Sequence, residues 1–182
     1  GWKAIEGAAG SGWAHELQDT ESFKVTRRVA VGVTGDGILR LDVSLEFENN
    51  PGDIEGTGLV RYRLGGGSGA DAGFVAASRV RTKGQPKSVE SHLWQGTEEE
   101  PWRREGEAQW VAMRRDGKLA VLFSKDSGYA AAASVDTTGT FLEGLPLATG
   151  PSKHSYQLAI GSNAPGILDS YGVEGELALI NR

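Results

Sequence analysis

The sequence contains no cysteine and no long apolar run. Without cysteine the chain can form no disulfide, hold no metal through thiolates and use no cysteine nucleophile. No stretch comes near the roughly 18 apolar residues that a membrane-spanning helix needs, and no basic-plus-apolar signal peptide stands at the N-terminus. We therefore predict no membrane insertion.

Positive charge is also scarce. The 19 Lys and Arg residues are outnumbered by 24 Asp and Glu residues, which gives a formal net charge of −5 at pH 7. A protein that binds duplex nucleic acid presents a basic face to the phosphates. We therefore predict no nucleic-acid partner, and the same charge argues against docking on an anionic membrane.

Glycine, by contrast, is plentiful, because the 27 glycines are about twice the ordinary share of a 182-residue chain. They stand singly between short apolar runs, so we expect them to mark turns. A chain of this length is most simply one domain, and we predict a single domain over residues 1–182.

The chain begins with Gly1-Trp2 instead of Met, so we expect a processed product or an excised domain. Flanking domains and a homo-oligomer both remain open. An extracellular or periplasmic location is favoured, although the absence of cysteine does not fix the compartment.

Alternating apolar residues give the strongest structural signal. Residues 39–47 place an apolar side chain at every second position, which predicts a strand because a helix would spread the same residues around its circumference. Residues 23–33 alternate in a similar way, with Val25, Val29 and Val31 on one face. The turn sequence Gly35-Asp36-Gly37 lies between them and predicts a hairpin.

Further short strands are expected along the rest of the chain, since turn signals recur about every 8–14 residues and no segment has a sustained 3.6-residue apolar stripe. We therefore predict an all-β fold, an antiparallel β-sandwich of about ten short strands with little or no helix. Residues 1–20 are expected to be an irregular lead-in, with Trp2 and Trp13 packed against the body. The other predicted strands are 59–64, 74–82, 88–93, 109–114, 118–124, 129–135, 140–142, 154–160 and 173–180.

The stretch 94–123 holds three of the five tryptophans, dense charge and the hairpin turn Arg115-Asp116-Gly117-Lys118. Indoles stack on the apolar faces of sugar rings, and carboxylates and guanidinium groups bond to hydroxyls, so this stretch predicts a carbohydrate-binding rim. The alternative is that the tryptophans seal the open edge of the sandwich and the glutamates are solvated. The predicted ligand-binding residues are His92, Trp94, Glu98, Glu100, Trp102, Arg103, Arg104 and Trp110. Alternation leaves open that Trp110 points into the core instead, so it is the least secure of the three tryptophans.

No catalytic residue is predicted. Crowding in the triplet Glu98-Glu99-Glu100 could raise one carboxyl pKa for acid/base work, but exposed neighbours perturb one another little. The three histidines lie far apart in the sequence without a metal-binding spacing. A G-x-S-x-G nucleophile motif is missing as well.

Two loops resemble cofactor sites. Asn49, Asp53 and Glu55 cluster oxygen ligands that would suit calcium, although an Asn-Pro-Gly-Asp turn explains the same residues. Residues 65–70 fit the dinucleotide fingerprint G-x-G-x-x-A. No helix of a βαβ unit is expected after them, so we predict a hairpin loop there and no cofactor.

Two passages carry a family resemblance. Residues 23–47, FKVTRRVAVGVTGDGILRLDVSLEF, are similar to paired strands in the tail domains of β-galactosidase and α-mannosidase, and residues 110–123, WVAMRRDGKLAVLF, resemble their later hairpin. Residues 154–161, HSYQLAIG, would be the near-terminal strand. On these passages the chain resembles the galactose-mutarotase-like supersandwich of aldose epimerases, glycoside hydrolases and polysaccharide lyases.

This resemblance implies a supersandwich-like fold and a role beside carbohydrate. It does not imply catalysis, since counterparts of the catalytic His and Glu of the epimerases are missing and function belongs to sites, not folds. We therefore predict a non-catalytic carbohydrate-binding or accessory domain of a carbohydrate-active enzyme such as a glycoside hydrolase. The alternatives are a structural subunit of a virion, filament or cell surface, and a sugar epimerase or polysaccharide lyase.

Overall fold

The computed structural model describes twelve strands and two short 3-10 segments. The described residues are 3–7, 10–20, 23–33, 35–48, 59–64, 75–81, 89–94, 102–124, 130–136, 139–146, 151–173 and 177–181. The strands are β1 (Lys3–Gly7), β2 (Gly10–Thr20), β3 (Phe23–Val33), β4 (Leu39–Glu48), β5 (Leu59–Leu64), β6 (Val75–Arg81), β7 (Val89–Trp94), β8 (Trp102–Arg115), β9 (Lys118–Ser124), β10 (Ala130–Asp136), β11 (Gly139–Pro146) and β12 (Ser152–Ser162). The 3-10 segments are η1 (Pro165–Tyr171) and η2 (Leu177–Asn181).

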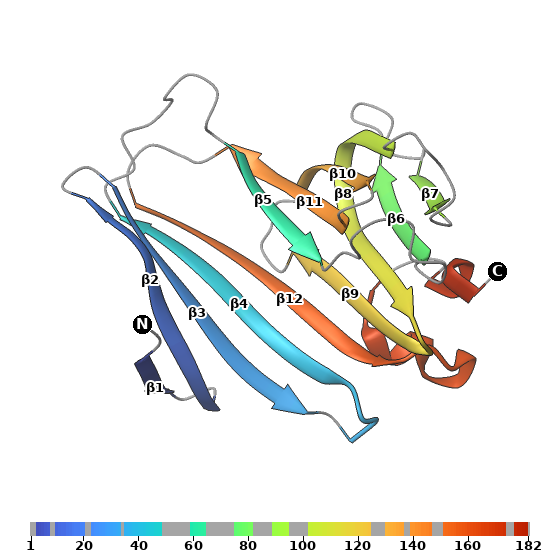
Figure 1. Cartoon of the computed structure of the whole chain (residues 1–182), viewed down its shortest axis with the longest axis horizontal. Coiled ribbons are helices and arrows are strands. Elements are labelled where there is room, and N and C mark those ends of the chain that lie inside the picture. Colours follow the sequence, from blue (N-terminus) through green and yellow to red (C-terminus); the bar gives the residue numbers. More distant parts are fainter. Residues whose placement is uncertain are drawn as a thin grey trace.

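The twelve strands form one sheet, in the order β1-β2-β3-β4-β12-β9-β8-β10-β11-β5, with β6 on β8 and β7 on β6 (Figure 1). Every pairing is antiparallel. The all-β prediction is confirmed, and in the described part of the chain helix is limited to the two short 3-10 segments. The architecture differs from the predicted sandwich, because the sheet is continuous and curls into a half-barrel. Within the described residues no helix is long and apolar enough to cross a membrane.

The two strongest turn predictions are confirmed. Between β3 and β4, the Asp36 side chain accepts a hydrogen bond from the Ile38 backbone nitrogen at 3.0 Å, and Gly37 has φ 79°. Between β8 and β9, Asp116 and Gly117 have φ 49° and 71°. Positive φ at both central residues defines the type I′ turn, whose twist matches that of the strands it joins.

Two predicted segments were wrong. Residues 1–20 are not an irregular lead-in, because the described part forms the hairpin of β1 and β2, and β2 continues the sheet by pairing with β3. The predicted strand 173–180 ends instead in η2, where Leu177 and Ile180 are both buried. A spacing of three places two side chains in line on a 3-10 turn, whereas the strand prediction relied on a spacing of two. The predicted packing of Trp2 and Trp13 concerns side chains outside the described set.

Strand β8 is long because it changes partners along its length. Its first half pairs with β10, and its second half pairs with β6 and β9. Gly106, in the first half, has φ 145°. Opposite β6 the register runs from Ala108 to Trp110, so Gln109 is an extra residue on β8, as in a β-bulge. The bulge reverses which positions of β8 face each side of the sheet.

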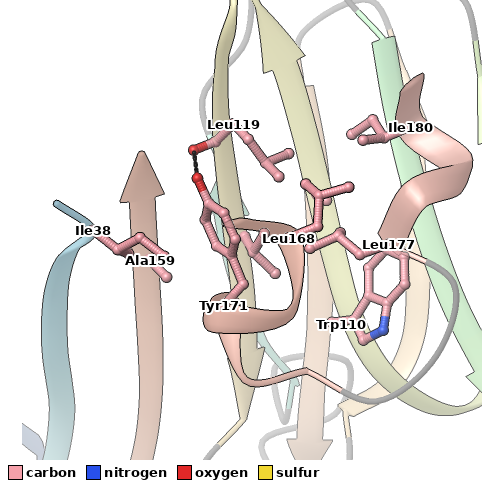
Figure 2. Packing of buried hydrophobic residues seen from close by; sticks show 10 residues of the cluster. Ile38, Trp110, Leu119, Ala159, Leu168, Tyr171, Leu177 and Ile180 are labelled. Carbon is pink, nitrogen blue, oxygen red and sulfur yellow. Dashed lines mark hydrogen bonds between the residues drawn. The ribbon is translucent and has the colours of Figure 1, made fainter. Parts of the chain in front are cut away.

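Buried side chains form a core on each face of the sheet. We call the face of Leu45 and Phe47 the concave face, because its cluster joins β4 to β5, strands that are far apart in the sheet order. The opposite face, with Trp110 and Val121, is the convex face, and η1 and η2 pack against it (Figure 2). The concave cluster contains Leu45, Phe47, Leu64, Val80, Ala108, Val111, Leu122, Ala133 and Leu142. The convex cluster contains Ile38, Trp110, Ala112, Leu119, Val121, Ala159, Leu168, Tyr171, Leu177 and Ile180.

Candidate functional site

The predicted carbohydrate rim falls on the β7 to β8 region of the sheet. The backbones of His92 and Trp94 lie at the end of β7, opposite Ser78 and Ala76 of β6; their side chains are outside the described set. Glu98 and Glu100 also lie outside the described residues. The remaining predicted residues belong to β8, which begins at Trp102, earlier than the predicted strand 109–114.

Trp102 and Arg104 lie on the concave face. Residues paired across antiparallel strands share a face, and these two pair with Val135 and Ala133, of which Ala133 belongs to the concave core. The indole of Trp102 is only partly buried and packs against both the concave core and Val135. Arg104 is also partly exposed. This places an indole and a guanidinium on one side of the sheet.

Arg103 points to the other side of β8. Its guanidinium donates to Glu143 at 3.0 and 2.8 Å and to Glu105 at 2.5 Å. These hydrogen bonds, the one to Glu143 first, raise the pKa of Arg103 above its ordinary value. Ser134 donates a further hydrogen bond to Glu143 at 3.3 Å. The geometry therefore separates Arg103 from Trp102 and Arg104 and engages it within the protein.

Trp110 is a core residue of the convex face. It is 1% exposed and packs in the cluster under the C-terminal segments (Figure 2). From this position the indole presents no face to a ligand in solvent. Trp110 is one of the predicted ligand-binding residues, with a core position as the alternative, and the structure places it in the core.

The weak calcium prediction at Asn49, Asp53 and Glu55 lies outside the described residues, as does the glycine-rich loop 65–70. Among the residues whose positions the structure gives, no three His, Asp or Glu side chains are grouped so as to hold a metal ion. The predicted turn and its calcium-binding alternative are therefore both untested.

The concave face also carries a polar group that was not predicted from the sequence. Arg27 and His154 are both paired with Leu45, so they lie in one row across β3, β4 and β12. His154 contacts the ring of Phe47 edge-on, with ring centroids 5.6 Å apart. Tyr156 stands one row further along the same face, and burial raises its pKa, while the positive charge of Arg27 lowers it. One sequence signal could have identified this group. Arg27 occupies the odd-numbered position between Val25 and Val29, where the alternation predicts an apolar residue.

Carboxylates in this part of the sheet occupy the convex face. On β3, β4, β9 and β12, every carboxylate whose side chain is described lies in the even-numbered row of β4, which faces away from Leu45. Glu46 binds Arg28 at 2.7 Å and lies 3.7 Å from Lys153. The ion pairs of Glu46 therefore lie on the convex side of these strands.

Comparison with known proteins adds no family. No protein-family model matches the chain, and no curated protein matches it either.

Proposed function

We propose that the chain is a non-catalytic carbohydrate-binding module, an accessory domain that holds sugar for a carbohydrate-active enzyme. The observation that carries this proposal is the position of Trp102, a partly exposed indole on the concave face, with Arg104 on the same face of β8. A flat aromatic ring suits the apolar face of a sugar, and a guanidinium donates to its hydroxyl groups.

The packing of Trp102 supports this role. One part of the indole rests against the concave core and Val135, which would fix the ring before the ligand arrives. A side chain that is already ordered loses little conformational entropy on binding. The resemblance of residues 23–47 and 110–123 to the tail domains of glycoside hydrolases is the ground for an accessory role.

The test is a titration of the chain with a panel of neutral and acidic oligosaccharides, followed by intrinsic fluorescence and calorimetry. We expect a spectral shift in the wild type and, by calorimetry, an affinity that Trp102→Ala lowers by roughly twofold to tenfold, the range for loss of one aromatic contact, and that Trp102→Phe partly keeps. Trp110→Phe is the matched control, since it changes a buried indole on the opposite face and should leave affinity unchanged. If no sugar binds, or if Trp102→Ala binds as the wild type does, the proposal is wrong.

The edges of the sheet support a second candidate function, that of a subunit in a larger assembly. Strands β1 and β5 end the order of the sheet, and an edge strand offers backbone groups to another chain. Light scattering after size exclusion separates the two functions. A mass that rises with concentration would favour assembly, and a monomer at high concentration would favour the binding module.

A further inference from the structure

The sequence contains two Asp-Gly dipeptides, Asp36-Gly37 and Asp116-Gly117. Such a dipeptide is prone to spontaneous rearrangement, because glycine has no Cβ to shield its backbone nitrogen from the preceding carboxyl group. One dipeptide lies in the turn between β3 and β4, and the other lies in the turn between β8 and β9. The same chemistry is therefore present twice in one fold, in two different surroundings.

Asp116 stands at the exposed tip of its hairpin. Its side chain is 87% exposed, and Oδ2 lies 3.6 Å from Nε of the half-exposed Arg115. The turn pairs Arg115 with Lys118 and leaves the Gly117 nitrogen outside the ladder. A Cβ added to Gly117 would meet nothing within 4 Å. The carboxyl group of Asp116 and the nitrogen of Gly117 are therefore both accessible.

The carboxyl group of Asp36 is held in place instead. Its side chain is 27% exposed, and Oδ1 accepts a hydrogen bond from the Ile38 backbone nitrogen at 3.0 Å. Oδ2 lies 3.8 Å from Nη2 of Arg40, which also donates to the Tyr171 carbonyl oxygen at 3.4 Å. These contacts turn the carboxyl group away from the Gly37 nitrogen.

The backbone of Asp116 favours opening of its turn. Its φ is 49°, in the left-handed region that a residue with a Cβ adopts at a cost. In a type I′ turn the Gly117 nitrogen lies away from the Asp116 side chain, so the two groups meet only after rotation about the Cα–C bond of Asp116. Opening permits that rotation and breaks few contacts, because residues 115–118 are all exposed.

We propose that Asp116-Gly117 is a site of spontaneous aspartate isomerisation and that Asp36-Gly37 is protected from it. The Gly117 nitrogen bonds to Cγ of the neutral Asp116 carboxyl group, and its proton leaves with the carboxyl hydroxyl as water, which closes a succinimide ring. Water then adds to the ring and breaks the original peptide bond, so the chain runs through Cγ as isoaspartate. The composition is unchanged, and no oxidant or reductant takes part. The inference does not depend on carbohydrate binding.

The rearrangement reaches the C-terminal segment through Asn163. The Asn163 backbone nitrogen donates to the Gly117 carbonyl oxygen at 3.3 Å, and its side chain donates to Oδ1 of Asn181 at 3.2 Å. Asn181 donates in return to the Asn163 carbonyl oxygen at 2.9 Å. Isoaspartate adds a methylene group to the backbone, which the two-residue type I′ turn cannot accommodate. The altered turn therefore loosens the hold on η1 and η2.

The test incubates the folded protein in a mildly acidic buffer, in which part of the carboxyl groups is neutral. The protein is then unfolded and digested with the endoproteinase that cuts before aspartate but not before isoaspartate. Cleavage before Asp116 should decline several-fold faster than cleavage before Asp36, and in urea the two should decline alike. The proposal is overturned if cleavage before Asp116 persists, or if both positions decline at the same rate in the folded protein.

A pair of variants tests the same contrast by mass spectrometry. Asp116→Asn and Asp36→Asn each place asparagine before glycine, where it closes the same ring with loss of ammonia. Asparagine suits the type I′ turn, and its oxygen can accept the hydrogen bond from Ile38. The amide at position 116 should convert to the acid several-fold faster than the amide at position 36. Equal rates of conversion would overturn the proposal.

Hydrogen–deuterium exchange tests the coupling to the C-terminal segment. Peptides from 163–171 should exchange faster in incubated wild type than in fresh wild type, whereas peptides from 39–48 should not change. Asp116→Glu is the chemical control, because its longer side chain cannot close the five-membered ring, so incubation should leave its exchange unchanged. Unchanged exchange at 163–171 in isomerised wild type would overturn the coupling through Asn163.

Discussion

Tyr171 joins the C-terminal segment to the sheet through its hydroxyl group. The residue is 0% exposed, and its hydroxyl oxygen lies 2.9 Å from the Ser162 carbonyl oxygen. It also lies 3.3 Å from the Leu119 carbonyl oxygen (Figure 2). Space for the phenol exists because residue 161 is glycine, where a Cβ would lie 2.8 Å from the tyrosine oxygen. One hydroxyl thus links η1 to both β9 and β12.

Removing this hydroxyl should change both stability and its pH dependence. Burial raises the pKa of Tyr171 to about 12 from 10.0, with Arg40 opposing the shift. The fold favours the neutral phenol over the ionised form. The contribution of Tyr171 to the free energy of unfolding is therefore complete below about pH 10, and it is lost as the pH rises towards 12, because the unfolded chain ionises first. Because one pKa unit corresponds to about 1.4 kcal/mol, the free energy of unfolding should fall by roughly 2–3 kcal/mol over this pH range. Tyr171→Phe should be about 1–3 kcal/mol less stable at pH 7.

The measurement is urea unfolding of both proteins between about pH 8 and pH 11.5. The wild type should lose its advantage over Tyr171→Phe across the upper part of this range. Curves that keep a constant separation would show that the phenol titrates alike in the folded and unfolded chains.

Single residues also show where sequence reasoning reaches its limit. The alternation of Val43, Leu45 and Phe47 predicted a buried face correctly, because a spacing of two is a local property of a strand. For Trp110, alternation allowed a core position but could not identify the residues that bury it. These belong to η1 and η2, which lie far along the chain. The row of Arg27 and His154 depends on register between β3, β4 and β12, which the sequence does not state.

At the scale of elements, β8 approaches β6 closely at a glycine. Gly106 has φ 145°, and a Cβ there would lie 2.3 Å from the Arg81 carbonyl oxygen and 2.9 Å from a Val80 methyl. Both neighbours belong to β6, so the backbones of the two strands approach more closely than a side chain would allow. The predicted strand 109–114 did not include the first half of β8, because the pairing of that half with β10 depends on tertiary structure.

Gly106→Ala should therefore be strongly destabilising, by at least about 2–3 kcal/mol, because it adds backbone strain to a steric clash. Gly32→Ala on β3 is the control, since nothing lies within 4 Å of its added Cβ, and it should change stability by less than about 1 kcal/mol. Chemical denaturation of both variants compares the two sites. Equal effects would mean that β8 and β6 separate readily at Gly106.

At the scale of the whole molecule, the sequence predicted strands and turns but not their order. Each hairpin, such as that of β8 and β9, follows from a local turn at Asp116 and Gly117. The position of β12 between β4 and β9 does not follow from any local turn, because the partners of β12 are set by burial on both faces of the sheet. A local pattern of alternation is the same in a sandwich and a half-barrel, so it could not distinguish them.

The central place of β12 predicts its protection from solvent exchange. Its residues are paired with β4 over Ser152 to Ile160 and with β9 over Tyr156 to Ser162. Backbone amides hydrogen-bonded on both sides open only with larger parts of the fold. Hydrogen–deuterium exchange followed by mass spectrometry should therefore find peptides from 152–162 slower than those from 59–64, at the end of the sheet. Equal rates would contradict this.

This late central strand has a consequence for synthesis on the ribosome. Until residues 152–162 emerge, the nascent chain can form two partial sheets, β1–β4 and β5–β11, whose facing borders β4 and β9 lack their common neighbour. Two chains growing close together could therefore each accept the other's β12, using the same registers that the monomer uses. The product would be an intertwined dimer held by native pairings, and its yield would depend on how densely ribosomes follow one another along the message.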